Sequence, residues 1–419
     1  MNAINIYSPN KNISGEIVLS GSKSISNRVL LIKALCHQKF EIFNLSESDD
    51  TSSMEQLIHS NEETLDAHHA GTTFRFLTAY LAIKSEKNII LTGSERMKQR
   101  PIKALVDALN YLGANIEYVE KEGFPPLRIL PSSGLWKNEI SLPADISSQY
   151  ISALLLIAPV LINGLKIHLE GEIVSRPYIE MTIGIMSYFG VSVDWEGKTI
   201  SIGNQQYIPR DFHVEADWSA ASYYYTIAGL SETADILLKG LHVDSLQGDC
   251  SIAEIGKFFG IESVFGDHQV RILKRKELNP PEHFEYNFIK VPDIAQSISV
   301  LCGGLGTHGL FSGLQTLRIK ETDRIAALQQ ELAKIQVYLN KMPAKFSKKT
   351  AIEYYLQEGK ATSDLTDNPE IDTYNDHRMA MAFAPLSLLF PIKINNPEVI
   401  SKSYPGFWKD LISLGFEIK

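Results

Sequence analysis

Cysteines and long hydrophobic runs are both scarce in this sequence. The only three cysteines, Cys36, Cys250 and Cys302, lie far apart and do not show the spacing of metal ligands. Because so few thiols suit a reducing compartment, we expect free core cysteines and a cytoplasmic protein. The first residues form no apolar signal segment, and no run reaches the ~20 apolar residues of a membrane span. The longest run, residues 150–161, contains a polar serine and a proline and predicts a buried helix, so we expect no membrane partner.

Positive charge is also in short supply. The chain has 40 Lys and Arg against 49 Asp and Glu, which gives a net charge of −9. Nucleic-acid binding requires many cationic side chains to neutralise phosphates, so this balance excludes a broad nucleic-acid surface. Binding of small anions stays open, because a local cluster of cations in a cleft is enough.

The remaining composition is that of a folded globular protein. Of 419 residues, 44% are hydrophobic and 21% are charged. This length exceeds what a single hydrophobic core usually serves, so the sequence predicts two domains.

A repeated pattern gives the organisation within those domains. An amphipathic helix ends at a glycine and a strand follows at once, at Gly113, Gly190, Gly260 and Gly415. A fifth copy is predicted after Leu332, with Lys334 in place of the glycine. Hairpins follow several copies, and in one of them Glu196 and Gly197 are predicted to form the turn. The pattern indicates several copies of one α/β module, of which the first, near residue 60, lacks both glycine and hairpin and is expected to be shortened.

Polar and cationic residues gather where helices of these modules are predicted to begin. The segments 21–28 (GSKSISNR), 70–75 (AGTTFR) and 97–102 (MKQRPI) each place a basic residue at or near a strand-to-helix turn. The unpaired N–H groups and the dipole of a helix N-terminus favour an anion there. Each segment also has an ordinary interpretation as a packed turn or a solvated arginine.

Further segments of this kind occur in the rest of the chain: 147–149 (SSQ), 175–178 (SRPY), 291–293 (VPD), 320–324 (KETDR), 375–381 (NDHRMAM) and Lys402. Capping alone would explain Ser147, Ser175 and Asp293. In KETDR, Lys320 and Arg324 are predicted to be i, i+4 neighbours on one helix face. Together these segments predict an anion-binding cleft with two acids, Asp293 and Glu321, available for proton transfer.

The same motifs, in the same order from about residue 15 to 410, resemble those of the 3-phosphoshikimate 1-carboxyvinyltransferase (EPSP synthase) family. The resemblance implies an α/β fold of two similar domains, each of three βαβαββ units around pseudo-threefold symmetry, of the inside-out α/β barrel type. The domains would be 21–214 and a discontinuous 1–20 plus 215–419, with the active site in the cleft between them. The N-terminal strand would complete the sixth unit.

The resemblance also assigns the ligands, phosphoenolpyruvate and shikimate 3-phosphate. Shikimate 3-phosphate would contact Lys23, Ser24, Arg28, Ser147, Ser148, Gln149, Ser175, Tyr178, Asp293 and Lys320. Phosphoenolpyruvate would contact Lys23, Gly71, Arg100, Gln149, Arg324, Arg378 and Lys402.

By the same resemblance the chain would transfer the enolpyruvyl group without a metal or organic cofactor, as a monomer. Asp293 would serve as the base for the sugar hydroxyl and Glu321 as the group for the methylene proton, with the order of their action open. His69 and Thr316 stand where relatives often have Asn, so those two contacts are expected to differ.

Two alternatives have specific sequence signatures. The sister enolpyruvyl transferase that acts on UDP-N-acetylglucosamine has a loop cysteine five residues before its Arg-Pro pair, where this chain has Glu95. A catalytically silent anion-binding scaffold would have lost Asp293, Glu321 or several of the cations, and all of these are present.

Overall fold

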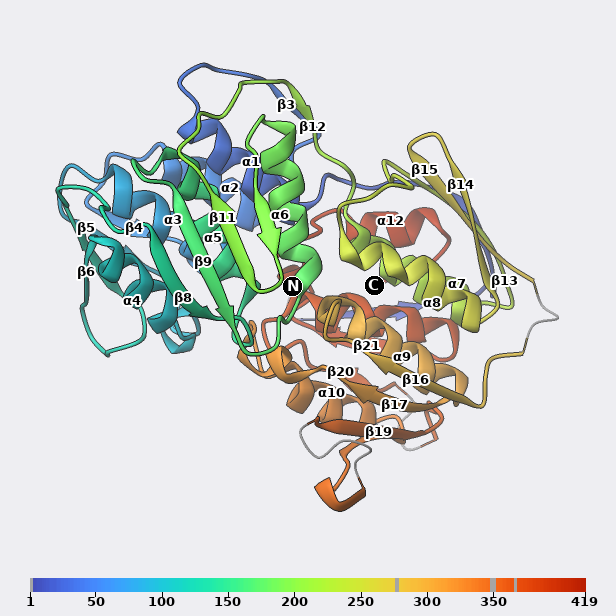
Figure 1. Ribbon diagram of the computed structural model, residues 1–419. Helices are drawn as coiled ribbons and strands as arrows, with labels where there is room; N and C mark the ends of the chain where they lie inside the picture. Colours follow the sequence, from blue (N-terminus) through green and yellow to red (C-terminus); the bar gives the residue numbers. More distant parts are fainter. Residues whose placement is uncertain (1–2, 276–278, 347–351, 365–367) are drawn as a thin grey trace. The chain divides into compact units, whose positions relative to one another are not determined.

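The computed structural model describes residues 3–275, 279–346, 352–364 and 368–419. The chain forms two compact units (Figure 1). The continuous unit is Gly21–Val214, and the discontinuous unit joins the N-terminal segment through Ser20 to Glu215–Lys419. Each unit has its own hydrophobic core, and no core cluster contains residues of both.

The discontinuous unit is built from one module used three times. In its first module, β2 (Asn12–Val18) and β13 (Thr233–Lys239) are parallel neighbours. A hairpin follows, and its second strand, β15 (Gln269–Lys274), lies antiparallel beside β13. The elements are β2 (Asn12–Val18), α7 (Trp218–Leu230), β13 (Thr233–Lys239), α8 (Ile252–Phe258), β14 (Ile261–Gly266) and β15 (Gln269–Lys274), and the sheet order is β14-β15-β13-β2.

The other two modules of this unit repeat that strand order. The second contains β16 (His283–Asn287), α9 (Ala295–Leu305), β17 (His308–Ser312), α10 (Arg324–Ala333), β18 (Val337–Lys341) and β19 (Tyr354–Gly359). The third contains β20 (Glu370–Ile371), α11 (His377–Phe383), β21 (Ile392–Asn395), α12 (Phe407–Ser413), β22 (Glu417–Ile418) and β1 (Ala3–Tyr7). Strand β1 lies between β21 and β22 and is antiparallel to both, so the N-terminal strand completes the third module.

The continuous unit repeats the module twice in full. One copy contains β4 (Thr64–Asp66), α3 (Gly71–Lys84), β5 (Ile89–Thr92), α4 (Lys103–Leu112), β6 (Asn115–Tyr118) and β7 (Leu127–Leu130). The next contains β8 (Glu139–Pro143), α5 (Ser148–Ile157), β9 (Leu165–Glu170), α6 (Arg176–Tyr188), β10 (Asp194–Glu196) and β11 (Thr199–Ile202). Both sheets show the same strand order as the modules of the discontinuous unit.

The first module of the continuous unit is shorter, as the sequence predicts. It contains α1 (Lys23–Leu35), β3 (Ile42–Phe43), α2 (Asp49–Ile58) and β12 (Phe212–His213). Its sheet is a single parallel pair of two-residue strands, and α2 leads to β4 without a hairpin. The predicted fold class of repeated βαβαββ modules is confirmed, with this shortened copy as the exception.

The first helix of each module packs in the centre of its unit. Helices α7, α9 and α11 contact one another, and so do α1, α3 and α5. These helices are apolar around most of their circumference, and residue after residue is buried in α7 and α5. A helix that is hydrophobic all round belongs in a core, whereas α4 and α10 keep one polar face toward solvent. The central helices therefore place their N-terminal residues next to one another within each unit.

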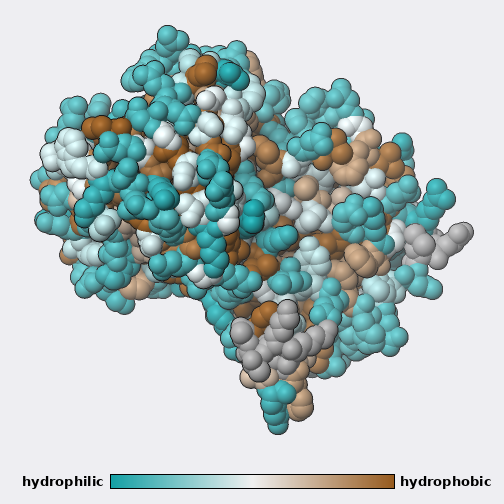
Figure 2. Space-filling view, viewed as in Figure 1, coloured by the Kyte–Doolittle hydropathy of each residue, from teal (hydrophilic) through white to brown (hydrophobic). Residues whose placement is uncertain are grey.

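The surface is of an ordinary kind. On the face shown in Figure 2, hydrophilic residues cover most of the area and hydrophobic ones lie scattered between them. Among the described helices, none combines the length and the apolar character needed to cross a bilayer. The run at 150–161, predicted to be a buried helix, forms α5 and the short 3-10 helix Ala158–Val160 in the core.

Glycines end four of the predicted amphipathic helices. The end of the fifth helix and the position of one hairpin turn differ from the prediction. Gly113, Gly190, Gly260 and Gly415 all have positive φ. In the fifth copy Lys334 is right-handed, and the left-handed position before the strand is taken by Gln336, with φ of 62°. The hairpin turn lies one residue later than predicted, because Glu196 pairs with Thr199 and leaves Gly197 and Lys198 to turn.

Gln336 provides a stability test. A non-glycine residue pays a penalty in the left-handed conformation, so Gln336→Gly should raise the free energy of unfolding by about 0.5 to 1 kcal/mol after allowing for the flexibility of glycine in the unfolded chain. Ala333→Gly, at the last residue of α10, should lower it by a similar amount. Urea denaturation measures both, and destabilisation by both variants would contradict the assignment of strain to Gln336.

Candidate active site

Lys23 and Arg28 lie in the first two turns of α1 and have different surroundings. The Lys23 Nζ lies 3.1 Å from Asp50 Oδ2 of α2. Arg28 is buried and donates to Thr182 Oγ1 at 2.7 Å, to Ser152 Oγ at 3.1 Å and to the carbonyls of Ser24 and Tyr178 at 2.7 and 3.3 Å. Burial lowers the pKa of Arg28 to about 10. Among the described residues no carboxylate pairs with it, so its positive charge is uncompensated in this part of the continuous unit.

Gly71 and Arg100 approach each other closely. A Cβ atom at Gly71, the first residue of α3, would lie 2.5 Å from Arg100 Nη1, so a side chain there would displace the guanidinium from its present position. Arg100 is buried, and its Nε finds no partner in the described part of the chain. A buried guanidinium beside exposed N–H groups of a helix N-terminus is an arrangement that suits an anion.

The N-termini of α5 and α6 differ from each other. Ser147 caps α5 by accepting from Gln149 N at 3.3 Å, and Gln149 Nε2 donates to Thr72 Oγ1 at 2.9 Å. Ser175 makes no cap hydrogen bond, so the capping interpretation is wrong for it. Ser175 is instead buried with φ of 52°, a left-handed conformation that is costly for serine and typical of strained functional sites.

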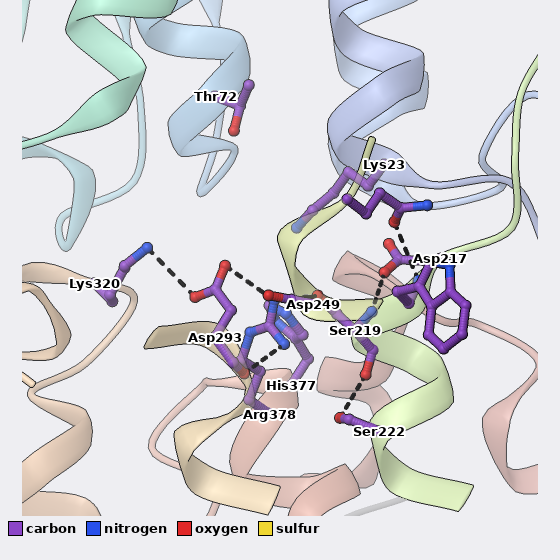
Figure 3. A network of polar contacts seen from close by, with 12 residues as sticks. Lys23, Thr72, Asp217, Ser219, Ser222, Asp249, Asp293, Lys320, His377 and Arg378 are labelled. Atoms are coloured by element: carbon purple, nitrogen blue, oxygen red, sulfur yellow. Dashed lines mark hydrogen bonds and ion pairs between the residues drawn. The ribbon is translucent and has the colours of Figure 1, made fainter. Parts of the chain in front are cut away.

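In the discontinuous unit, three cations surround Asp293. Lys320 Nζ lies 3.4 Å and Arg324 Nη1 3.1 Å from Asp293 Oδ1, while Arg378 Nη2 lies 3.3 Å from Oδ2. Figure 3 shows Lys320 and Arg378 approaching Asp293 from different elements. Asp293 belongs to the 3-10 helix Pro292–Ile294, and α9 after it has no side-chain cap, so the capping interpretation of Asp293 is wrong as well.

Arg324 is the centre of a carboxylate cluster formed by Asp293, Glu321 and Asp376. Its Nε lies 2.7 Å from Asp376 Oδ2 and its Nη2 2.8 Å from Glu321 Oε2. Burial alone would lower the pKa of this guanidinium, but the charges of Asp376, Glu321 and Asp293 together raise it above its ordinary value. Arg324 therefore stays charged and is held in a fixed orientation by the three acids.

The predicted helical relation between Lys320 and Arg324 is wrong. Lys320 is extended, with ψ of −157°, and α10 begins only at Arg324, where Asp323 caps it by accepting from Ile325 N and Ala326 N at 3.1 Å. N-capping by Asp323 fixes the start of the helix at Arg324 and leaves KETD as a loop. The two cations nevertheless meet, because both reach Asp293.

The segment before α11 joins further predicted residues to the cluster. Asp376 caps α11 by accepting from Arg378 N at 2.9 Å, and Arg378 Nη1 donates to the carbonyl of Asp293 at 2.9 Å. Lys402 lies at the end of the 3-10 helix Pro397–Lys402 and donates to the carbonyl of Asn375 at 2.6 Å. The discontinuous unit thus brings together Asp293, Lys320, Glu321, Arg324 and Arg378, with Lys402 attached through the turn before α11.

Asp249 is a buried carboxyl group beside this cluster that the sequence analysis did not single out. It accepts a hydrogen bond from Ser219 Oγ, which in turn accepts from Arg378 Nη2 at 3.3 Å. Figure 3 shows Asp249 and Asp293 pointing toward one another. Burial, followed by the charge of Asp293, raises the pKa of Asp249 to about 7.

Asp249 predicts a dependence of stability on pH. Its pKa in the folded state lies above the ordinary value of about 3.9, so stability falls as pH rises between these values, because the unfolded chain ionises there while the folded protein keeps Asp249 protonated. Asp249→Asn removes this cost. The free energy of unfolding of Asp249→Asn minus that of the wild type should therefore be about 3 kcal/mol larger at pH 8 than at pH 5.

Urea denaturation of both proteins at the two pH values measures this difference. The exposed Asp244→Asn is the control and should show the same relative stability at both. A difference for Asp249→Asn that does not change with pH would contradict the raised pKa.

Several of these neighbours carry little or no signal in the sequence. Asp376 lies inside the segment 375–381 given in the sequence analysis, directly before His377 and Arg378, but was not named there as a site residue. Thr72 lies inside the segment 70–75 but was not named there as a site residue, whereas Asp50 and Asp249 lie in stretches without a distinctive pattern. Of the two positions that depart from the family pattern, Thr316 is buried with an Oγ1 that has no partner in the described ranges. His69 lies beside a cavity of about 460 Å³ next to α2.

Comparisons with known proteins place the chain in a family. The family model described as EPSP synthase (3-phosphoshikimate 1-carboxyvinyltransferase) matches residues 7–60 and 55–411. A 3-phosphoshikimate 1-carboxyvinyltransferase of Bacteroides fragilis is 47% identical over 409 residues, which cover 97% of each chain. The chain belongs to the EPSP synthase family. A family member of Neisseria meningitidis serogroup B is 35% identical over 426 residues, covering 95% of each chain.

Solved structures support the fold. The EPSP synthase of Acinetobacter baumannii covers the whole of both chains with a TM-score of 0.77 at 21% identity. The enolpyruvyl transferase NikO of Streptomyces tendae covers 100% of this chain and 98% of its own, with a TM-score of 0.73 at 12% identity. The family resemblance predicted from the ordered motifs is confirmed. In the described part of this family member, no group of three or more His, Cys, Asp or Glu is arranged to hold a metal ion.

Proposed function

We propose that the chain transfers the enolpyruvyl group of phosphoenolpyruvate to the 5-hydroxyl of shikimate 3-phosphate and releases phosphate. The observation that carries this proposal is the 47% identity, over 97% of both chains, with a relative named for that activity. The two sets of cationic helix N-termini support it, since two substrates with several negative charges need such groups.

The ligand assignments are proposed as the resemblance gives them. In the continuous unit, shikimate 3-phosphate would contact Lys23, Ser24, Arg28, Ser147, Ser148, Gln149, Ser175 and Tyr178, and phosphoenolpyruvate would contact Lys23, Gly71, Arg100 and Gln149. The uncompensated charge of Arg28 and the close approach of Arg100 to Gly71 support these roles. Because Arg28 also braces α1 against α5 and α6, its loss would disturb packing as well as binding.

In the discontinuous unit, Asp293 and Lys320 would contact shikimate 3-phosphate, and Arg324, Arg378 and Lys402 would contact phosphoenolpyruvate. Arg324 is shared among three carboxylates and buried. Arg324 would therefore stabilise a bound anion with a positive charge that is already fixed in place and needs no reorganisation when the ligand binds. The predicted placement of the active site between the domains stays a prediction.

The reaction needs three proton transfers. A proton added to the methylene carbon of phosphoenolpyruvate makes the adjacent carbon electrophilic, and the 5-hydroxyl adds to that carbon as it loses its proton, giving a tetrahedral intermediate. Loss of a methyl proton and breakage of the bond to the phosphate oxygen then re-form the double bond and release phosphate. The enzyme therefore needs a group that accepts a proton and one that donates and later accepts one.

The surroundings of the two acids favour different roles. Three cations within 3.4 Å favour the ionised form of Asp293, which suits a base for the 5-hydroxyl. Glu321 lies 2.8 Å from Arg324 and its side chain is 15% exposed, so a proton can reach it. We assign Asp293 to the hydroxyl and Glu321 to the methylene proton, and the order in which they act stays open.

Phosphate release by the purified protein tests the proposal. We expect release with phosphoenolpyruvate plus shikimate 3-phosphate, none when either is omitted, and none with UDP-N-acetylglucosamine as acceptor. Release only with the sugar nucleotide would establish the sister activity, and binding of both ligands without release would establish a silent scaffold. The cytoplasmic location and monomeric state stay predictions, and gel filtration checks the second.

A further inference from the structure

A strained turn precedes α11. Tyr374 and Asn375 are consecutive and both left-handed, with φ of 52° and 55°. This conformation costs a non-glycine residue roughly 1–2 kcal/mol, and asparagine tolerates it better than tyrosine does. Two such residues in succession persist only where the surrounding structure holds them.

This turn carries the supports of two proposed phosphoenolpyruvate ligands. The carbonyl of Asn375 accepts a hydrogen bond from Lys402 Nζ at 2.6 Å. The next residue, Asp376, accepts from Arg324 Nε at 2.7 Å and is fully buried. A turn that relaxed to right-handed φ values would redirect the Asn375 carbonyl and move the start of α11.

Glu331 holds the turn from α10. Its side chain is 0% exposed, its Oε1 accepts from Tyr374 Oη at 2.6 Å, and its Oε2 accepts from Asp372 N at 2.9 Å and Lys334 Nζ at 2.7 Å. Burial, followed by the hydrogen bond to Glu331 and its charge, raises the pKa of Tyr374, so the phenol stays protonated and donates. A buried carboxylate with this many donors is well satisfied and rigid.

One face of α10 thus fixes both ends of the turn. Glu331 follows Arg324 by seven residues, which is two helical turns and the same face. Arg324 binds Asp376 after the turn, and Glu331 binds Asp372 and Tyr374 before and within it. The helix that begins in the carboxylate cluster is therefore also the element that keeps the turn strained.

We propose that Glu331 is a positioning residue that, with Tyr374, holds the left-handed turn and thereby fixes Lys402 and the Asp376–Arg324 pair for the anion of phosphoenolpyruvate. It has no contact with the substrate in this role. The inference rests on the proposed function for its kinetic consequences, and its structural part stands independently of it.

Glu331→Gln tests the proposal, since glutamine keeps the volume but cannot accept all three donors. We expect KM for phosphoenolpyruvate to rise roughly tenfold, because strain of this size shifts the population of the turn by at least that factor, with KM for shikimate 3-phosphate changed less than twofold. Tyr374→Phe should act in the same direction. The control Glu254→Gln removes an exposed carboxylate paired with Lys257 and should change neither.

Two further measurements separate positioning from simple loss of stability. Adding Asn375→Gly to Glu331→Gln should recover part of the lost affinity, because glycine adopts the left-handed conformation without penalty. Hydrogen exchange of the peptide 368–380 should be faster in Glu331→Gln than in the wild type, whether or not the protein releases phosphate. A wild-type protein without activity would contradict the proposed function alone. The role of Glu331 would be overturned if hydrogen exchange of peptide 368–380 were unchanged in Glu331→Gln. Equal rises in both KM values that Asn375→Gly does not reverse would overturn it as well.

Discussion

Replacing Arg324 by methionine is expected to lower the free energy of unfolding by about 3 to 5 kcal/mol and to abolish turnover. The substitution keeps an unbranched side chain but leaves Asp293, Glu321 and Asp376 without their shared cation. Asp376 and the Arg324 guanidinium are 0% and 2% exposed, so water cannot replace the lost partner. Urea denaturation and phosphate release measure the two effects.

Arg324→Lys tests the same prediction with a milder substitution. Lysine keeps the positive charge, but its single ammonium group cannot reach three carboxylates in the geometry of the planar guanidinium. We expect a smaller loss of stability than with methionine, and still a loss of most turnover. The control is Arg271→Lys, whose guanidinium forms an exposed pair with Asp235 and should give no measurable change. Equal effects at positions 324 and 271 would contradict a structural role for the carboxylate cluster.

Asp293→Asn is expected to lower turnover by roughly 10²- to 10⁴-fold while both ligands still bind, because the amide cannot accept the proton of the 5-hydroxyl. Asparagine is a sharper test than alanine, since it keeps the shape of the side chain beside Lys320 and Arg324. Arg324 still has Asp376 and Glu321 as partners, so folding should be affected less than by its own replacement.

The matched control for Asp293→Asn is Asp323→Asn. Asp323 lies in the loop that contains Lys320 and Glu321 and caps α10, and asparagine caps a helix as well as aspartate does. Its turnover should equal that of the wild type. Direct binding of each ligand by calorimetry completes the comparison. Wild-type turnover in Asp293→Asn would remove Asp293 from the mechanism, and failure to bind shikimate 3-phosphate would make it a ligand contact only.

Local sequence patterns predicted the modules well because each module follows local rules. The glycines at 113, 190, 260 and 415 have the positive φ that ends a helix, and the shortened first module was visible as a missing glycine and hairpin. The errors are local as well. Asp323 competes for the helix start and breaks the predicted i, i+4 relation in KETDR, and Gln336 shows that a non-glycine residue can take the left-handed position when the fold holds it.

The sequence by itself determined the family, the repeated α/β modules and the residue types gathered at the helix N-termini, because these depend on order along the chain and on neighbours within a few residues. Only the tertiary structure decided which charges meet. Arg324 finds Asp376 52 residues later, and Arg378 reaches Ser219 from 159 residues away. Those pairings follow from the packing of α7, α9, α10 and α11 in one core. For KETDR in particular, the sequence supplied the charges, and the fold made Arg324 the shared partner of three acids.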